Sequence, residues 1–497
     1  MLPTFFSALE QVLEPTTLGL MLLGVAIGFV VGILPGLGGA VTLALMLPFT
    51  YDMPPVQAFA FLLGMWVVTA TTGDITSVLF GIPGEATSAA VVLDGYPLTR
   101  RGEAGRALGA VLFSSVLGAW IGALALAAAV PVIRPVVLAL GPPEFFVLTL
   151  VGLTFVASLS GENVLKGLIM AFFGLLVATI GIDPQAGIPR YVFGQLYLWD
   201  GIDIVPLVVG LFGGAEVLQI MLSKQSIAGD QADRAKGVAG LRTGITDTLH
   251  HWWLVLRSSL VGVGIGVIPG MGGSVAQFIA YGQAQQASKH PEEFGKGSIE
   301  GVIATGAVNN AKDSGSLIPT IGFGIPGSVG TAVLLSAFLI TGLNPGKEML
   351  TTNLDVTFSM VWVTVLANLV AVIASFALLR PLTRLTFISG PLLVPFLLIV
   401  LALGSYTASN SFADIVVMFA AAAFGVAAIH WDWPRVPFLL AIVLGGIAER
   451  YLFLSYSLFR WNWMTRPIVL GLWAVLLVVA LRPLVRGFLA RRREGST

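Results

Sequence analysis

The chain has 497 residues, of which 56% are hydrophobic and only 10% charged, with a mean hydropathy of +0.92 and a formal net charge of +0. Soluble domains contain about a quarter charged residues, so this composition excludes a soluble protein of this length. The balanced charge gives no indication of nucleic-acid binding, and the absence of cysteine excludes disulfides, thiolate catalysis and Cys-ligated clusters.

The first residues indicate a short helix at the membrane surface instead of a cleavable signal peptide. Residues 1–15 contain two glutamates and no Lys or Arg, whereas a signal peptide begins with a basic region. Large apolar side chains recur there at helical spacing, at Phe5, Phe6, Leu9 and Leu13. A helix with one apolar face suits the boundary between water and lipid, so we predict an interfacial helix over residues 1–17.

Apolar stretches close to the length of a membrane span recur along the remainder of the chain. In chain order they are Leu18–Leu34, Leu108–Val130, Phe145–Leu159, Gly167–Ile182, Val356–Leu379, Leu392–Leu403, Ile415–Ile429, Val436–Leu454 and Ile468–Leu481. With the interrupted segments described below, they predict an all-α polytopic membrane protein with roughly 11–13 membrane passes.

Three basic regions indicate which side of the membrane the loops face. They are the polar stretch Ser223–His251, the turn Arg380–Arg384 and the tail Arg482–Arg493. Lys and Arg concentrate in cytoplasmic loops, so we place all three regions, and the loop Arg100–Arg106, in the cytoplasm. The carboxyl terminus then lies inside and the amino terminus outside, in the inner membrane of a bacterium.

Two motifs occur twice, in the same order and at similar spacing. Residues 32–39 read GILPGLGG and residues 266–273 read GVIPGMGG, while FGIPG stands at both 80–84 and 323–327. This duplication predicts two structural repeats, of inverted topology as in many transporters. The predicted organisation is an interfacial helix (1–17), a first transmembrane half (18–222), a polar cytoplasmic linker (223–256), a second transmembrane half (257–481) and a basic cytoplasmic tail (482–497).

Each motif places proline and glycine inside an apolar segment, where proline removes a backbone donor and glycine permits left-handed backbone. We therefore predict broken or re-entrant helices at Pro35, Pro83, Pro269 and Pro326. Half-helix amino termini would offer N–H groups to an anion, and unwound carbonyls would bind a cation such as Na⁺. The alternative is that these glycines only permit close helix packing. Duplication of both motifs favours a substrate site.

Polar residues beside the motifs are the candidate ligands. For a substrate carboxylate we predict Gly84, Ser88, Asn310, Lys312, Gly327 and Ser328, and for a coupling cation Gly36, Asp74, Gly270 and Asn309. Burying an ionisable group at membrane depth is costly, which favours a functional role for Asp74, Lys312 and Asp313. The alternative is a structural ion pair between Lys312 and either aspartate. We predict no catalytic residue, no cofactor and no metal beyond the coupling ion, which is Na⁺ or H⁺.

Four segments carry a resemblance to a known family. They are the run PGEATSAAVVLDGYPLTRRGEAGRALG from Pro83 to Gly109, the NNA that precedes the second FGIPG, GSYTASN at 404–410 and LGGIAER at 444–450. In these the chain resembles the large membrane subunit, or permease, of the tripartite tricarboxylate transporter family (the TctA type). The resemblance implies a secondary transporter that works with a small membrane subunit and a periplasmic solute-binding protein. It further implies uptake of citrate-like or other carboxylates, driven by a sodium or proton gradient.

Two stretches depart from that family's pattern. Thr72, Gly73 and Asp74 stand where a Gly-Gly-Ser type of stretch is usual, and residues 304–306 read Ala-Thr-Gly where an Ala-Pro-Glu type is usual. The acid that the family carries before the paired asparagines is therefore missing here. These departures leave the particular carboxylate and the coupling ion open.

Three other function classes compete with this interpretation. A standalone secondary transporter would need no binding protein, although a major-facilitator fold would have more continuous helices. A membrane-embedded enzyme would need a catalytic constellation at membrane depth, and the chain contains no HExxH, no GxGD and no intramembrane histidine. An ATP-driven pump is disfavoured because there is no GxxxxGK[ST] motif.

Overall fold

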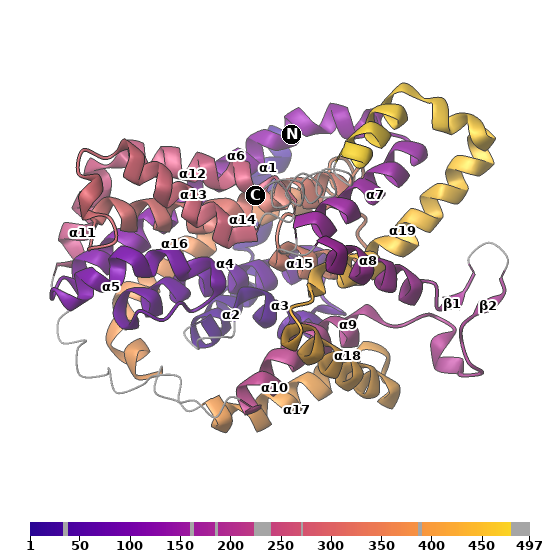
Figure 1. The fold of residues 1–497 in the computed structure, drawn as a ribbon, viewed down its shortest axis with the longest axis horizontal. Coiled ribbons are helices and arrows are strands. Elements are labelled where there is room, and N and C mark those ends of the chain that lie inside the picture. The colour runs from indigo at the N-terminus through magenta and orange to yellow at the C-terminus, as the bar shows by residue number, and fades with distance from the viewer. Residues whose placement is uncertain are drawn as a thin grey trace, which may run out of the picture.

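The computed structural model describes residues 1–32, 38–159, 164–183, 187–222, 240–269, 272–385 and 390–478, and these are almost entirely helical (Figure 1). This confirms the predicted all-α class. In the described residues the strands form one short hairpin, in which β1 (Gly181–Ile182) pairs antiparallel with β2 (Pro189–Arg190). The predicted positions Pro35, Gly36 and Gly270 lie outside the described residues, as do the tail 482–497 and residues 223–239 of the predicted linker.

The elements before the linker are α1 (Leu2–Leu13), α2 (Pro15–Gly32), α3 (Gly39–Met46), α4 (Pro55–Phe80), the 3₁₀ segment η2 (Ala86–Val91), α5 (Val92–Arg100), α6 (Ala104–Ala139), α7 (Pro142–Leu159), α8 (Val164–Ala178), α9 (Ile204–Val208), the π-helical turn η4 (Val209–Gly214) and α10 (Ala215–Leu222). After the linker come α11 (Leu241–His250), α12 (Trp252–Gly266), α13 (Gly272–Ala287), α14 (Ile299–Phe323), α15 (Val329–Ile340), α16 (Leu354–Leu385), α17 (Gly390–Ser409), α18 (Phe412–His430), α19 (Arg435–Phe459) and an apolar helix over Pro467–Val478.

Seven helical segments in the described part of the chain are long and apolar enough to cross a membrane. They are Pro15–Gly32, Pro55–Phe80, Ala104–Ala139, Ile204–Met221, Leu354–Leu378, Phe412–His430 and Arg435–Thr465. Shorter apolar helices accompany them, among them Val164–Ala178 and Trp252–Gly266. The chain is therefore a multi-pass membrane protein, and the total of 11–13 passes stays a prediction.

Helices α4 and α14 form the centre of the bundle (Figure 1). The spanning part of α4 is completely buried, and α14 is buried from Gly301 to Gly322. Both helices carry Thr, Ser and Asp side chains, and α14 also carries Asn. Lipid would not solvate these groups, so the two helices must be enclosed by others. Glycines on the surrounding helices allow the close approach. A Cβ on Gly28 of α2 would lie 2.5 Å from the Met65 carbonyl oxygen, and one on Gly118 of α6 would lie 1.9 Å from that of Ala307.

The contacts of the two halves match in pairs. Helix α2 packs on α4 as α12 packs on α14, and α6 packs on α14 as α16 packs on α4. At the periphery α1 contacts α16 as α11 contacts α6, and near the motifs α3 contacts α15 as α13 contacts η2. Two interlocked copies would produce this pattern, so it supports the predicted repeat. The inverted orientation of the copies stays a prediction.

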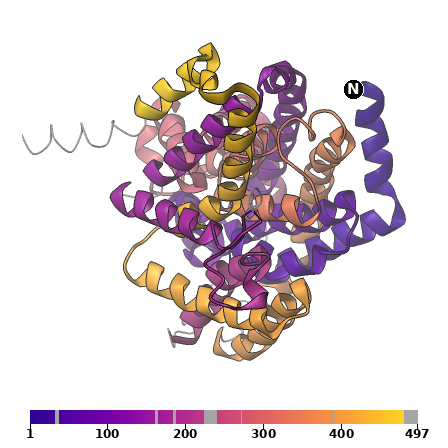
Figure 2. The same cartoon turned by 90° about the vertical axis from the view of Figure 1, so that its right-hand side faces the viewer.

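The predicted amino-terminal helix is present as α1, at the edge of the bundle (Figure 2). Only Ala8 and Val12 are buried on it, and it is held to α16 by its aromatic residues. The Phe5 ring lies 4.8 Å from the Trp362 ring between centroids, and the Trp362 Nε1–H donates to the Phe5 carbonyl at 2.8 Å. A position at the lipid–water boundary stays a prediction.

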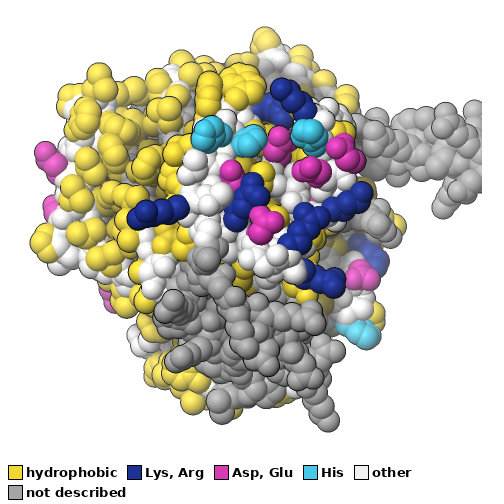
Figure 3. Space-filling view, turned by 90° about the vertical axis from the view of Figure 1, so that its left-hand side faces the viewer, with side chains coloured by type: hydrophobic (Ala, Val, Ile, Leu, Met, Phe, Trp, Pro, Cys, Tyr) yellow, Lys and Arg dark blue, Asp and Glu magenta, His cyan; other side chains and the backbone are white. Residues whose placement is uncertain are grey.

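Charged side chains gather on one end of the molecule, over α5, α11 and the turn before α14 (Figure 3). There Arg106 pairs with Asp247 at 2.6 Å and with Glu103 at 2.9 Å. The Arg100–Arg106 loop and the end of the linker therefore lie on the same side of the protein, which agrees with their predicted placement. The β1–β2 hairpin projects at the opposite end (Figure 1).

Candidate functional site

Both FGIPG copies interrupt a central helix in the same way. Helix α4 ends at Phe80 and is followed by Gly81 with φ +68°, and α14 ends at Phe323 and is followed by Gly324 with φ +68°. This left-handed backbone favours glycine, because a side chain would clash with the following carbonyl. The predicted breaks Pro83 and Pro326 lie in the non-helical residues that follow, and Pro269 lies in the turn that follows α12.

The chain then turns back against the helix it has just left. The Gly84 N–H donates to the Gly73 carbonyl at 3.4 Å, and a Cβ on Gly84 would lie 2.4 Å from the Gly73 Cα. In the second copy, a Cβ on Gly327 would lie 2.6 Å from the Ser316 Cβ and 2.3 Å from the Gly266 carbonyl oxygen. Only glycine permits such a close return of the backbone, which is why both motifs end in glycine.

Asp74 and Asn309, both predicted cation ligands, meet at the contact of α4 with α14. The Asn309 Nδ2–H donates to Asp74 Oδ2 at 2.8 Å and to the Ala70 carbonyl at 3.0 Å. Ser88 also lies beside the Asp74 carboxylate. Three oxygen atoms of this group, Asp74 Oδ1, Asn309 Oδ1 and Ser88 Oγ, are fully buried, and within the described part of the chain they lack a partner in full hydrogen-bond geometry. Buried oxygens without donors are suited to accept a cation or a proton.

Lys312 forms a buried ion pair with its neighbour on α14, Asp313. The Nζ–Oδ1 distance is 3.1 Å, and the two side chains are 4% and 8% exposed. A cavity of about 10 Å³ lies beside them, lined by Ile265, Gly266, Gly273, Lys312, Asp313, Ser316, Gly327 and Ser328. The structure therefore brings three predicted substrate ligands, Lys312, Gly327 and Ser328, around one small cavity.

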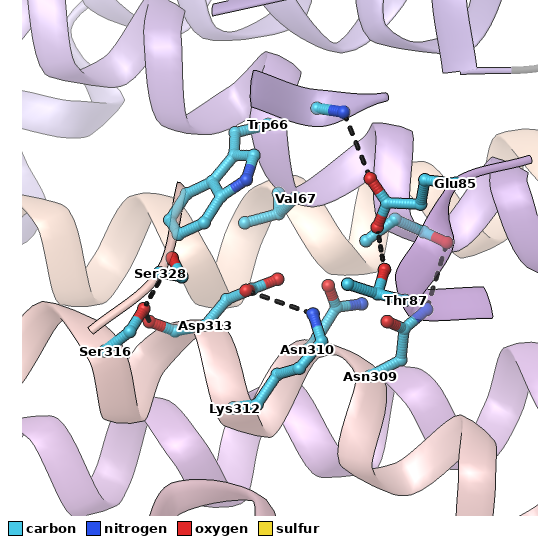
Figure 4. Close-up of polar contacts among 12 residues, drawn as sticks. Trp66, Val67, Glu85, Thr87, Asn309, Asn310, Lys312, Asp313, Ser316 and Ser328 are labelled. Atoms are coloured by element: carbon cyan, nitrogen blue, oxygen red, sulfur yellow. Dashed lines mark hydrogen bonds and ion pairs between the residues drawn. The ribbon is translucent and has the colours of Figure 1, made fainter. Parts of the chain in front are cut away.

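Glu85 is a member of this site that our predicted set did not include. Its Oε2 accepts the backbone N–H of Gly39, at the start of α3, at 3.1 Å, and its Oε1 accepts the hydroxyl of Thr87. Figure 4 shows Glu85 and Thr87 on one side of the site, with Ser316 and Ser328 on the other. The sequence feature that could have identified Glu85 as a site residue is its position directly after the first FGIPG motif.

Asn310, predicted as a substrate ligand, is engaged elsewhere. Its Nδ2 lies within hydrogen-bonding distance of Thr71 Oγ1 at 3.0 Å, Ser115 Oγ at 2.8 Å and Asn368 Oδ1 at 2.7 Å. These acceptors belong to α4, α6 and α16, so Asn310 ties four helices together. It does not line the Lys312 cavity.

The model of the tripartite tricarboxylate transporter TctA family matches residues 18–440 of this sequence. The chain belongs to the TctA family. As a TctA protein it is the large membrane subunit of a tripartite transporter, and the family is one of transporters, not of enzymes.

Two relatives of this TctA protein come from Agrobacterium vitis. An "Uncharacterized 52.8 kDa protein in TAR-I ttuC' 3'region" is 34% identical, over 96% of this chain and 95% of the relative. An "Uncharacterized protein in TAR-II ttuC' 3'region" is 31% identical over 45% of this chain and 94% of the relative. No solved structure matches the chain.

Within the TctA protein, the run from Pro83 to Gly109 also fastens the two halves together. Asp94 of α5 accepts the backbone N–H groups of Gly297 and Ser298, at 2.8 and 2.9 Å, where α14 begins. The LGGIAER segment lies in α19, and its Glu449 pairs with Arg190 of β2 at 2.8 Å. These contacts give structural roles to segments that carried the resemblance.

Proposed function

We propose that this protein is the permease of a bacterial inner-membrane uptake system that moves a small tri- or dicarboxylate together with Na⁺ or H⁺. The observation that carries the proposal is that an acidic group and a basic group lie close together where the helices break. At Asp74, buried oxygens of the described residues lack hydrogen-bond partners, and a buried lysine beside a cavity, Lys312, lies close by on α14. A carrier that couples an anion to a cation needs both kinds of group at membrane depth.

The cation would bind at Asp74. One carboxylate with neutral amide and hydroxyl oxygens supplies the hard donors that an alkali cation or a proton prefers. Asp74 and Ser88 come from the first half and Asn309 from the second, so bound cation would hold the halves in one arrangement. The neighbouring helix break supplies carbonyl oxygens that could complete the coordination.

The carboxylate would bind at Lys312. The lysine is the cationic side chain that lines the cavity, and Ser316 and Ser328 add hydroxyls to the same wall. A volume of about 10 Å³ admits one water-sized group and no whole carboxylate, so this conformation is closed around the site. Substrate entry then requires the segments at Gly84 and Gly327 to move relative to α13 and α3, as one part rocks or slides against another.

The proposed partners follow from family membership. A periplasmic solute-binding protein would deliver the carboxylate, and a small membrane subunit would complete the complex in the bilayer. The alternative is a carrier that works without a binding protein. The duplicated helix breaks are compatible with both kinds of carrier.

The test is reconstitution of the chain in liposomes with its candidate small subunit and binding protein. Uptake of labelled citrate and of labelled succinate is followed with and without a sodium gradient, and with a proton gradient alone. We expect uptake that needs both the binding protein and one of the gradients. Uptake that persists without the binding protein favours the standalone carrier. Folded protein that moves no carboxylate under any gradient contradicts the proposal.

A further inference from the structure

The two copies of the helix break differ at the residue that directly follows FGIPG. In the first copy this residue is Glu85, and in the second it is Ser328. The backbone is the same at both, with φ −141° and ψ 167° at Glu85 and φ −145° and ψ 169° at Ser328. The difference between the copies is therefore one of side-chain chemistry at a matched position.

In the first copy the glutamate fills the space in front of α3. Its carboxylate accepts the N–H of Gly39, the first residue of that helix, at 3.1 Å. A carboxylate at this position is stabilised by the unpaired N–H groups and the positive end of the helix. The protein thus contains its own example of a carboxylate bound at a GLGG-type motif.

In the second copy, no described carboxylate is hydrogen-bonded to the matching N–H of Gly273, although Asp313 lines the cavity beside it. Ser328 is too short, and its hydroxyl is turned to its own helix, where it accepts the Thr331 N–H in a capping box. Gly273, which matches Gly39, lines the cavity of about 10 Å³ together with Ser328. In this closed conformation, a cavity that admits one water-sized group therefore lies near the place that the Glu85 carboxylate takes in the first copy.

A buried cation faces that cavity. Lys312 stands at the same distance before FGIPG as Thr69 does in the first copy. Its Cε lies 2.5 Å from where a Cβ on Gly273 would be, so only glycine at that position leaves room for the lysine. Its ion-pair partner among the described residues is Asp313, its neighbour in the chain. Adjacent residues on a helix do not face each other, so the lysine must bend back to reach Asp313.

We propose that a carboxylate group of the transported substrate binds in this cavity, in the place that Glu85 takes in the first copy, and replaces Asp313 as the partner of Lys312. The inference rests on the proposed function and specifies where its anion binds. The substrate carboxylate would contact Lys312, Ser328 and the backbone at Gly273. Asp313, once released, becomes a buried carboxylate that needs a cation or a proton, which links anion binding to coupling.

The test installs the missing carboxylate in the protein itself. Ser328→Glu places the side chain of the first copy into the second, and Ser328→Gln is the matched control. Both variants lose the Ser328 cap and have nearly the same size, so they differ only in charge. Both are made in the wild-type chain and in a Lys312→Thr background, purified in detergent, and compared by thermal unfolding without substrate.

We expect Ser328→Glu to unfold at a higher temperature than Ser328→Gln when Lys312 is present, and this difference to vanish in the Lys312→Thr background. In liposomes, labelled citrate uptake by Ser328→Glu should fall by roughly tenfold or more relative to Ser328→Gln, because the internal carboxylate occupies the subsite. Equal unfolding temperatures for the two variants would overturn the proposal, as would equal citrate uptake by the two variants if the wild-type chain transports citrate.

The unfolding measurement separates this inference from the proposed function. If the wild-type chain moves no carboxylate but the charge-dependent stabilisation requires Lys312, the anion subsite stands and the proposed function fails. If the wild-type chain moves citrate but the Glu and Gln variants behave alike in both measurements, the proposed function stands and the subsite is wrong.

Discussion

Asn309 of α14 donates a hydrogen bond of 2.8 Å to Asp74 of α4, and the two residues are 235 positions apart in the sequence. This bond joins the two halves of the chain at the buried centre of the bundle. It occupies one oxygen of the carboxylate, whereas the other, Oδ1, has no partner in full hydrogen-bond geometry among the residues that the structure describes. One oxygen of the Asp74 carboxylate is therefore bonded within the protein, and the other is available to a ligand.

Asp74→Asn should abolish cation-dependent uptake while the protein stays folded. The amide keeps the shape and can still accept from Asn309, but it removes the charge that would hold a cation. We expect citrate uptake in proteoliposomes to lose its response to the gradient, with a fall of roughly tenfold or more.

Glu144→Gln is the matched control for Asp74→Asn. Glu144 is also a fully buried carboxylate, but it pairs with Arg466 at 2.9 Å, away from the helix breaks. This variant should lower the unfolding temperature and leave the gradient response intact. A normal gradient response in Asp74→Asn would contradict the cation role.

Lys312→Gln should impair both folding and uptake, because it leaves Asp313 buried without its partner. Breaking a buried pair in this way costs about 3–5 kcal/mol. Lys312→Gln/Asp313→Asn removes both charges and should recover most of that stability. If Lys312 binds the substrate, the double variant will be folded and will still fail to take up citrate. Uptake at the wild-type rate by the folded double variant would assign the pair a purely structural role.

Gly84→Ala and Gly327→Ala should each destabilise the protein by about 1–3 kcal/mol, because a new methyl group would overlap the backbone of the preceding helix. The predicted Cβ positions are 2.4 Å from the Gly73 Cα and 2.3 Å from the Gly266 carbonyl oxygen. Gly282→Ala is the control, since nothing lies within 4 Å of its Cβ position. In thermal unfolding, Gly84→Ala and Gly327→Ala should each unfold at a lower temperature than Gly282→Ala. Equal unfolding temperatures for the three variants would contradict the close backbone contacts at Gly84 and Gly327.

The native absence of cysteine makes the membrane orientation directly testable. Single cysteines can be placed at Phe193, which is exposed just after the projecting hairpin, and at Arg242, on α11 at the charged end. An impermeant maleimide added to intact cells should label Phe193→Cys and spare Arg242→Cys until the membrane is opened. Labelling of both residues, or of Arg242→Cys alone, would reverse or invalidate the predicted topology.

The helix breaks and the central acid could be predicted from residue type alone. Adjacent proline and glycine inside an apolar segment favour a helix break, so Pro83 and Pro326 needed no tertiary information, although α6 continues through the isolated prolines Pro131 and Pro135. Asp74 and Asn309 were recognisable because polar groups at membrane depth are costly. Their direct contact was not predictable, since it depends on how the two halves interlock.

Asn310 and Glu85 make contacts that we did not predict from the sequence, and the role of Asn310 as a substrate ligand stays a prediction. Asn310 is two residues from Lys312, so on a helix the two side chains point in different directions, and the helical period could have separated them. Asn309 and Asp313, four residues apart, share a face. Glu85 acquires its role only because α3, far away in sequence, begins against it. No local pattern predicts that contact.

The packing of helices of the first half against helices of the second half has a consequence for biosynthesis. Because α4 packs against α16 and bonds to α14, the first half cannot bury its own polar centre while the ribosome is still making the second. Asp74 enters the membrane long before Asn309 is synthesised, and the insertion machinery must shelter it in the meantime. Chains that stop before α14 should therefore be degraded, and the folded protein should form only after the second half has entered the membrane.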